Sequence, residues 1–181
     1  AETRETAVST VNSAEISYTV GGKSGGLHGY FPSGVRMTEK TLQGKQVYTL
    51  EAKGTDDKKT MYFSVNDQKL NQEVLNGNGV EITVEYLDSG SGILTLVYDE
   101  VFDEIEDGSY EGIRRWVDPI QGKYGGFVDL EDSKLWKTHT FYIRDPKFLK
   151  RLPNNSDFYF SINNPYSGNS PDDVSIASVS V

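Results

Sequence analysis

Residues 109–132 of this 181-residue chain combine aromatic rings with planar polar side chains. Proteins that bind sugars generally stack the apolar face of a pyranose on an exposed ring and bond its hydroxyls with amide, carboxylate or guanidinium groups. Such groups usually lie on loops that a rigid sheet supports. The candidate ligand-binding residues of this segment are Tyr110, Arg114, Arg115, Trp116, Gln121 and Tyr124. In the alternative interpretation, Trp116 and Phe127 close one end of the fold, and the arginines pair with the acidic run 99–107.

Two other loops carry residues of the same kinds. Tyr30 lies in the Gly-rich segment 21–34, and Asn164 and Tyr166 lie in the segment 163–166. Asparagine and tyrosine suit the recognition of hydroxyl groups, but asparagine is also a common turn residue. These loops are therefore alternative positions for a ligand.

A catalytic site is not expected. Glycosidases need two opposed carboxylates roughly 5–9.5 Å apart, whereas Glu81 and Glu85 lie about 13 Å apart along one face of a strand. His139 lies on the same strand face as Phe141 and Ile143, where it is either buried or open to a groove on the sheet. The sequence contains no Ser-centred nucleophile elbow, no HExxH motif and no phosphate-binding loop.

The elements that would position these residues are mainly strands. Residues 80–86 alternate between apolar and polar side chains, the period of a half-buried strand, and residues 93–98 form an apolar run typical of a strand covered on both faces. Further strands are expected at 15–20, 47–52, 60–66, 135–143, 158–162 and 174–181. Asp145 and Pro146 suit the start of a short helix over 145–152, and Trp136 is expected in the core. We predict an all-β antiparallel jelly-roll sandwich of about nine or ten strands over 15–181, preceded by a linker or loose strand at 1–14.

Charge and composition exclude several classes of partner. The net charge of −9 argues against nucleic acid, which needs a basic face, and against anionic membrane surfaces. No apolar run is long enough to span a membrane. The chain has no cysteine, which excludes disulfides, thiolate metal sites and cysteine nucleophiles. A neutral polysaccharide remains compatible with this composition.

Several phrases of the chain together resemble a carbohydrate-binding-module-type jelly roll of secreted bacterial polysaccharide-degrading proteins. They are MYFSVND at 61–67, VEITVEYLDSGSGILTLVYD at 80–99, LWKTHTFYIRDPKFLKRLPNNSDFYFSI at 135–162 and the closing DDVSIASVSV. The resemblance implies a secreted, monomeric, non-catalytic module that binds a plant or microbial polysaccharide and is linked to a catalytic domain. It also implies a structural Ca²⁺ near the chain ends, for which Glu15, Asp172 and Asp173 are the candidate ligands.

Two alternatives to a carbohydrate-binding module remain open. One is a spacer domain that binds nothing, in which Trp116 and Tyr124 would be buried. The other is a jelly-roll glycoside hydrolase or lyase, which would release new reducing ends from a polysaccharide.

Overall fold

The computed structural model describes residues 16–22, 24–30, 40–53, 59–66, 69–70, 72–75, 78–99, 122–144, 146–163 and 171–181. Eleven strands lie in these residues. They are β1 (Ser17–Thr19), β2 (Leu27–Tyr30), β3 (Lys40–Leu42), β4 (Lys45–Leu50), β5 (Thr60–Val65), β6 (Val80–Leu87), β7 (Ile93–Tyr98), β8 (Lys123–Asp129), β9 (Trp136–Ile143), β10 (Phe158–Asn163) and β11 (Val174–Ser180). The predicted linker 1–14 lies outside the described residues.

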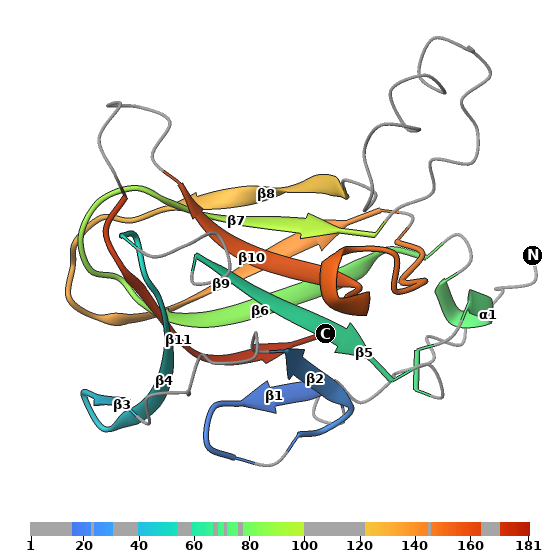
Figure 1. The fold of residues 1–181 in the computed structure, drawn as a ribbon, viewed down its shortest axis with the longest axis horizontal. Coiled ribbons are helices and arrows are strands. Elements are labelled where there is room, and N and C mark those ends of the chain that lie inside the picture. The colour runs from blue at the N-terminus through green and yellow to red at the C-terminus, as the bar shows by residue number, and fades with distance from the viewer. Residues whose placement is uncertain are drawn as a thin grey trace, which may run out of the picture.

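The strands form two antiparallel sheets that stack face to face (Figure 1). The six-stranded sheet has the order β3-β4-β11-β6-β9, with β1 also paired to β11, and the five-stranded sheet has the order β2-β5-β10-β7-β8. From β4 to β7 and again from β8 to β11, each strand lies in the sheet opposite to its predecessor, as in a jelly roll. The predicted all-β sandwich is confirmed. The strand number exceeds the prediction because β2 and β8 lie in segments expected as loops and β3 was not expected.

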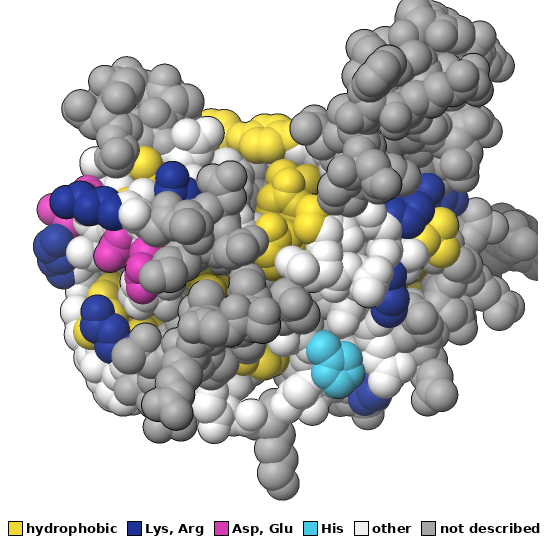
Figure 2. Space-filling model, viewed as in Figure 1, with side chains coloured by type: hydrophobic (Ala, Val, Ile, Leu, Met, Phe, Trp, Pro, Cys, Tyr) yellow, Lys and Arg dark blue, Asp and Glu magenta, His cyan; other side chains and the backbone are white. Residues whose placement is uncertain are grey.

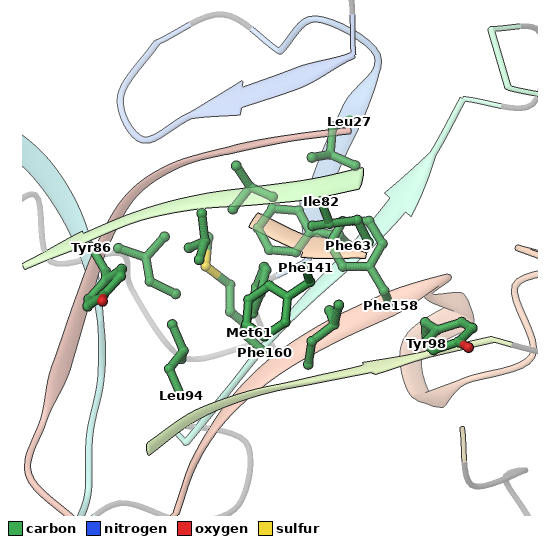
Figure 3. Packing of buried hydrophobic residues seen from close by; sticks show 14 of the residues in the cluster. Leu27, Met61, Phe63, Ile82, Tyr86, Leu94, Tyr98, Phe141, Phe158 and Phe160 are labelled. Atoms are coloured by element: carbon green, nitrogen blue, oxygen red, sulfur yellow. The ribbon is translucent and has the colours of Figure 1, made fainter. Parts of the chain in front are cut away.

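Alternating side chains of both sheets fill the space between them. Phe63 of β5, Phe158 and Phe160 of β10 and Phe141 of β9 form the aromatic centre of this core (Figure 3). Ile82 contributes from the six-stranded sheet and is fully buried. The period-two pattern of β6 therefore predicts its inward face correctly, because a strand's side chains alternate between the two faces of its sheet.

Helices are few and short in the described residues. One turn of α-helix, α1 (Gln72–Leu75), precedes β6, and a 3₁₀ turn, η3 (Pro153–Asn155), precedes β10. Neither comes near the length of a helix that crosses a membrane. The predicted helix over 145–152 is wrong for the residues that the structure describes there, because Phe148 and Lys150 have φ values of 46° and 58°, outside the right-handed helical region.

The segment 146–152 is instead held by two buried carboxylates. Asp99, at the end of β7, accepts hydrogen bonds from the backbone N–H of Leu149 (2.9 Å) and from Arg151, through Nε (3.0 Å) and Nη2 (2.7 Å). Asp157, before β10, accepts from the backbone N–H groups of Val65 (2.7 Å) and Lys150 (2.9 Å). These bonds satisfy backbone donors that a helix would have used internally.

Candidate functional site

The outer face of the five-stranded sheet brings together aromatic side chains from three strands. In β7, Leu94, Leu96 and Tyr98 belong to the core, so Thr95 and Val97 point away from it. Val97 is paired with Tyr124 of β8 on one side and with Tyr159 of β10 on the other. Tyr159 is paired in turn with Tyr62 of β5. One row across the outer face therefore carries Tyr124, Val97, Tyr159 and Tyr62.

A β-bulge adds a second ring to the β8 end of this row. Tyr124 and Phe127 are three residues apart, a spacing that places two side chains on opposite faces of a regular strand. The pairing of β8 with β7 shifts between Leu96 and Val97, so that Gly125 is an extra residue in β8. Gly126 follows with a φ of 116°, which favours glycine. The bulge therefore turns Tyr124 and Phe127 to the same face.

These two rings, which we call the β8 aromatic pair, are the exposed part of the row. Tyr124 is 55% exposed and Phe127 is 41% exposed. Their centroids are 6.5 Å apart and their planes are inclined by 30°. Hydrophobic side chains gather over β7, β8 and β10 on the face shown in Figure 2. An exposed pair of rings on a sheet edge suits stacking against the apolar face of a ligand.

The middle of the same face is less accessible. Tyr62 and Thr95 are buried there, and Tyr159 is half-buried. The rings of Tyr62 and Tyr159 lie 5.4 Å apart. Burial raises the pKa of the Tyr159 hydroxyl, and the neighbouring Tyr62 raises it further. The accessible aromatic surface among the described residues of this face is therefore concentrated on β8.

Only part of the predicted ligand-binding set can be located. Tyr124 is exposed as that prediction requires. The backbone of Tyr30 belongs to β2 and is paired with Tyr62. Seven candidate ligand-binding residues lie outside the described residues: Tyr110, Arg114, Arg115, Trp116, Gln121, Asn164 and Tyr166.

From the sequence, Phe127 suits sugar recognition in one interpretation and closes one end of the fold in the alternative; its 41% exposure contradicts the alternative. The adjacent glycines 125 and 126, inside a segment that otherwise suits a strand, were the available signal, because glycine within a strand often marks a bulge.

The two described calcium candidates each bind a backbone donor. Asp172 Oδ2 accepts from the N–H of Ser91 (2.7 Å), and Asp173 Oδ1 accepts from the N–H of Ala52 (2.8 Å). Within the described ranges, no three His, Cys, Asp or Glu side chains are grouped as a metal site requires. The third candidate, Glu15, lies outside those ranges, so calcium binding stays a prediction.

The opposite sheet presents a different outer face. Trp136 of β9 is paired with Leu87 and lies half-buried on this face, so its predicted core position is wrong. The Lys45 ammonium lies 5.4 Å from the centroid of the Trp136 ring and 2.9 Å from Glu85 Oε2. The indole is therefore partly covered by a cation that a carboxylate holds in place.

His139 points toward the interior of the sandwich. Its ring meets the Phe141 ring edge to face, with centroids 4.6 Å apart. Burial lowers the pKa of His139, which favours the neutral imidazole at neutral pH. The side chain is only half-buried, so it matches neither the fully buried alternative nor a histidine open to a groove.

The turn after β8 depends on a third buried carboxylate. Asp88 accepts from the backbone N–H groups of Glu131 (2.8 Å) and Ser133 (3.1 Å) and lies 2.9 Å from Lys137 Nζ. Burial opposes ionisation of Asp88, but the hydrogen bonds from Ser133, Lys137 and Glu131 outweigh it and hold the pKa well below its usual range. The carboxylate is therefore ionised at neutral pH.

Replacing Asp88 by asparagine is expected to reduce the free energy of unfolding at pH 7 by about 2 kcal/mol, because a charged acceptor is lost. The pKa of this carboxyl is lower in the folded protein than in the unfolded chain, where it is about 4. Its contribution to stability is therefore fully present at pH values above about 4 and is lost as the pH falls toward the folded pKa. The difference between wild type and Asp88→Asn should therefore shrink below pH 4. Urea unfolding of both proteins from pH 7 to pH 3 measures it, and a constant difference would contradict the assigned ionisation.

The segment 100–121 is bounded by two residues that the sheet holds close together. The last pair between β7 and β8 is Tyr98 with Lys123. Asp99 directly follows Tyr98 and Gly122 directly precedes Lys123, so these two residues lie next to each other at the end of the pairing. A Cβ atom placed on Gly122 would lie 2.7 Å from the Tyr98 carbonyl oxygen, which requires a glycine at this close approach.

Replacing residues 100–121 by a four-residue Gly/Ser linker is expected to preserve the fold. The shorter connection lowers the entropic cost of loop closure, so the free energy of unfolding should stay constant or rise by up to about 1.5 kcal/mol. Urea unfolding measures the change. A substantial loss of stability would instead show that residues of this segment support the core.

No protein-family model matches this chain, and no curated protein sequence matches it. The resemblance to carbohydrate-binding jelly rolls therefore stays a prediction.

Proposed function

We propose that this protein is a non-catalytic carbohydrate-binding module that binds a polysaccharide through the β8 aromatic pair. The observation that carries the proposal is the exposure of Tyr124 and Phe127 side by side on one face of an edge strand. Two exposed rings supported by a rigid sheet suit stacking on sugar units. In a spacer domain that binds nothing, this side-by-side pair of exposed rings would have no ligand to cover it.

The side chains next to the pair supply polar partners for sugar hydroxyls. Asp129 lies two residues after Phe127, on the same face, and is exposed. Asn163 of β10 and Asp129 are both paired with Ile93, so they flank the same outward position of β7. A carboxylate accepts hydroxyl protons, and an amide both donates and accepts. Binding by such a module would raise the local concentration of an attached catalytic domain near its substrate.

Affinity electrophoresis through gels that contain different polysaccharides tests the proposal. The panel includes cellulose derivatives, xylan, galactomannan, xyloglucan, polygalacturonate and alginate. The wild type should be retarded by at least one neutral polymer, and Tyr124→Ala and Phe127→Ala should each reduce the retardation by about tenfold in affinity, the loss expected for one aromatic contact.

Tyr142→Ala is the matched control, because Tyr142 is 70% exposed on the outer face of the other sheet. This variant should migrate like the wild type. Retardation that survives in both β8 variants but is lost in Trp116→Ala would keep the function and move the site to residues 109–121. Absence of retardation by every polymer would favour a spacer domain, and release of reducing ends from the panel would favour an enzyme.

A further inference from the structure

The outer face of the five-stranded sheet offers two paths for a long ligand, and burial separates them. A chain that crosses the strands from Tyr124 would pass over Val97 and Tyr159, which are half-buried, and then over Tyr62, which is 8% exposed. A chain that follows β8 would pass over Tyr124, Phe127 and Asp129, all exposed. Contact requires accessible surface, so the path along β8 is the open one.

We infer that the ligand is an extended, neutral polysaccharide whose chain runs along β8, with consecutive sugar units on Tyr124 and Phe127. This inference rests on the proposed function and specifies its substrate class. The two rings follow one another along the strand with centroids 6.5 Å apart, a separation of the order of one sugar unit. Stacking centred on each ring therefore requires two consecutive units.

The length of the open path favours a polymer. Tyr124 and Asp129 are paired with Val97 and Ile93, which are four residues apart on β7, so the path corresponds to about 13 Å of strand. This distance is about twice the separation of the two rings. A chain that lies on both rings therefore extends to Asp129, where its hydroxyls meet a carboxylate.

Charge selects against acidic polymers. The Asp129 carboxylate shares the face with the β8 aromatic pair, and the whole chain has a net charge of −9. A uronate unit near Asp129 would meet a like charge, which weakens binding most at low ionic strength. A neutral polymer avoids this repulsion.

The shape of the polymer follows from the rigid support of both rings. β8 is paired with β7 along its length, and the bulge, which bends the strand locally, places the two rings on one side of it. A ligand that contacts both from one side must itself be extended over two units. Helically coiled chains, such as those of α-linked glucose, turn successive units away from the side that carries both rings.

Isothermal titration calorimetry with defined oligosaccharides tests this inference. The probes are the cello-, xylo- and manno-oligosaccharides from one to six units, with the malto-oligosaccharides as a coiled control. At least one extended series should bind with an affinity that rises about tenfold from one unit to two and rises again toward six units. The malto series and oligogalacturonides should bind at least about tenfold more weakly than the extended series of equal length.

Substitutions on the two paths show whether the ligand runs along β8 or across the strands. Phe127→Ala and Asp129→Ala should weaken binding of the six-unit ligand, and Tyr159→Ala, on the path across the strands, should not once its fold is verified by circular dichroism. A loss of affinity in Tyr159→Ala without a loss in Asp129→Ala would overturn the inference. Full affinity for the single sugar, or equal affinity for the malto series, would also overturn it.

The proposed function and this inference fail in different ways. If electrophoresis shows polysaccharide binding that depends on Tyr124 while calorimetry finds full affinity for a single sugar, the function stands and the path along β8 is wrong. If neither method detects a ligand in any series, the proposed function itself is wrong.

Discussion

Replacing Asp99 by alanine is expected to lower the free energy of unfolding by about 3 to 5 kcal/mol, the usual cost of removing one partner from a buried ion pair. Asp99 is 1% exposed, and its carboxylate binds both Nε and Nη2 of Arg151. The backbone N–H of Leu149 also donates to it, at 2.9 Å. Alanine leaves this backbone donor and the guanidinium of Arg151, whose side chain is 23% exposed, without their acceptor.

Urea unfolding at pH 7 measures this loss. It would be a large part of the free energy of unfolding, which is about 5 to 15 kcal/mol for a typical domain. Asp129→Ala is the matched control, because Asp129 is an exposed aspartate at the end of β8 and its replacement should change stability by no more than about 0.5 kcal/mol. Equal, small losses in the two variants would show that the Asp99–Arg151 pair does not hold the segment 146–152.

Replacing Phe63 by alanine is expected to cost about 3 to 5 kcal/mol, because a large ring is removed from the centre of the core. Phe63 is fully buried, stacks on Phe158 at 5.2 Å and meets Phe160 edge to face at 6.1 Å. It also contacts the ring of Tyr18, at 5.7 Å. Tyr18 belongs to β1, which is paired with β11 of the six-stranded sheet, so the Phe63 ring joins the two layers.

Phe63→Leu serves as the control for this prediction. Leucine keeps much of the buried volume and should cost only about 1 to 1.5 kcal/mol. Urea midpoints of both variants, compared at constant m-value, measure the difference. If alanine and leucine gave the same loss, relaxation of the two sheets rather than the cavity would determine the cost.

The substitutions at Asp99 and Phe63 leave both residues of the β8 aromatic pair in place. Asp99→Ala and Phe63→Leu should therefore bind any polysaccharide like the wild type under conditions in which they remain folded. This separation allows a loss of binding in Tyr124→Ala or Phe127→Ala to be attributed to the surface, provided that their urea midpoints are unchanged.

Most of the strands could be predicted from the sequence, because their signal is local. In β6, Ile82, Val84 and Tyr86 alternate with polar residues, and all three point into the core as expected. Neighbouring residues alone determine this alternation, since successive side chains of a strand point to opposite faces. The all-β class follows from several such segments separated by turns.

Three edge strands were harder to recognise. β3 has only three residues, and β2 and β8 contain glycines that are also typical of loops. β2 and β8 depend on pairing with strands that lie far away in the sequence, whereas β3 forms a tight hairpin with β4, the next strand. Their local signal is weak because pairing, rather than propensity, stabilises them.

The candidate site was only partly predictable for the same reason. The chemistry of residues 109–132 indicates a sugar ligand, and Tyr124 was correctly expected at the surface. The position of Phe127 on the same face depends on the bulge at Gly125, which exists only in the pairing of β8 with β7. Sequence spacing by itself would place the two rings on opposite faces.

Long-range contacts also determined the roles of Trp136 and Asp99. Trp136 lies outside the core because its pairing with Leu87 places it on the outer face. Asp99, at the start of an acidic run, is buried because Arg151, more than fifty residues later, lies within hydrogen-bond distance. Local composition establishes strands, fold class and the kinds of side chain available for binding. Pairing between distant segments determines which face of the sheet a side chain occupies and which partner neutralises a buried charge. This pairing exists only in the folded chain.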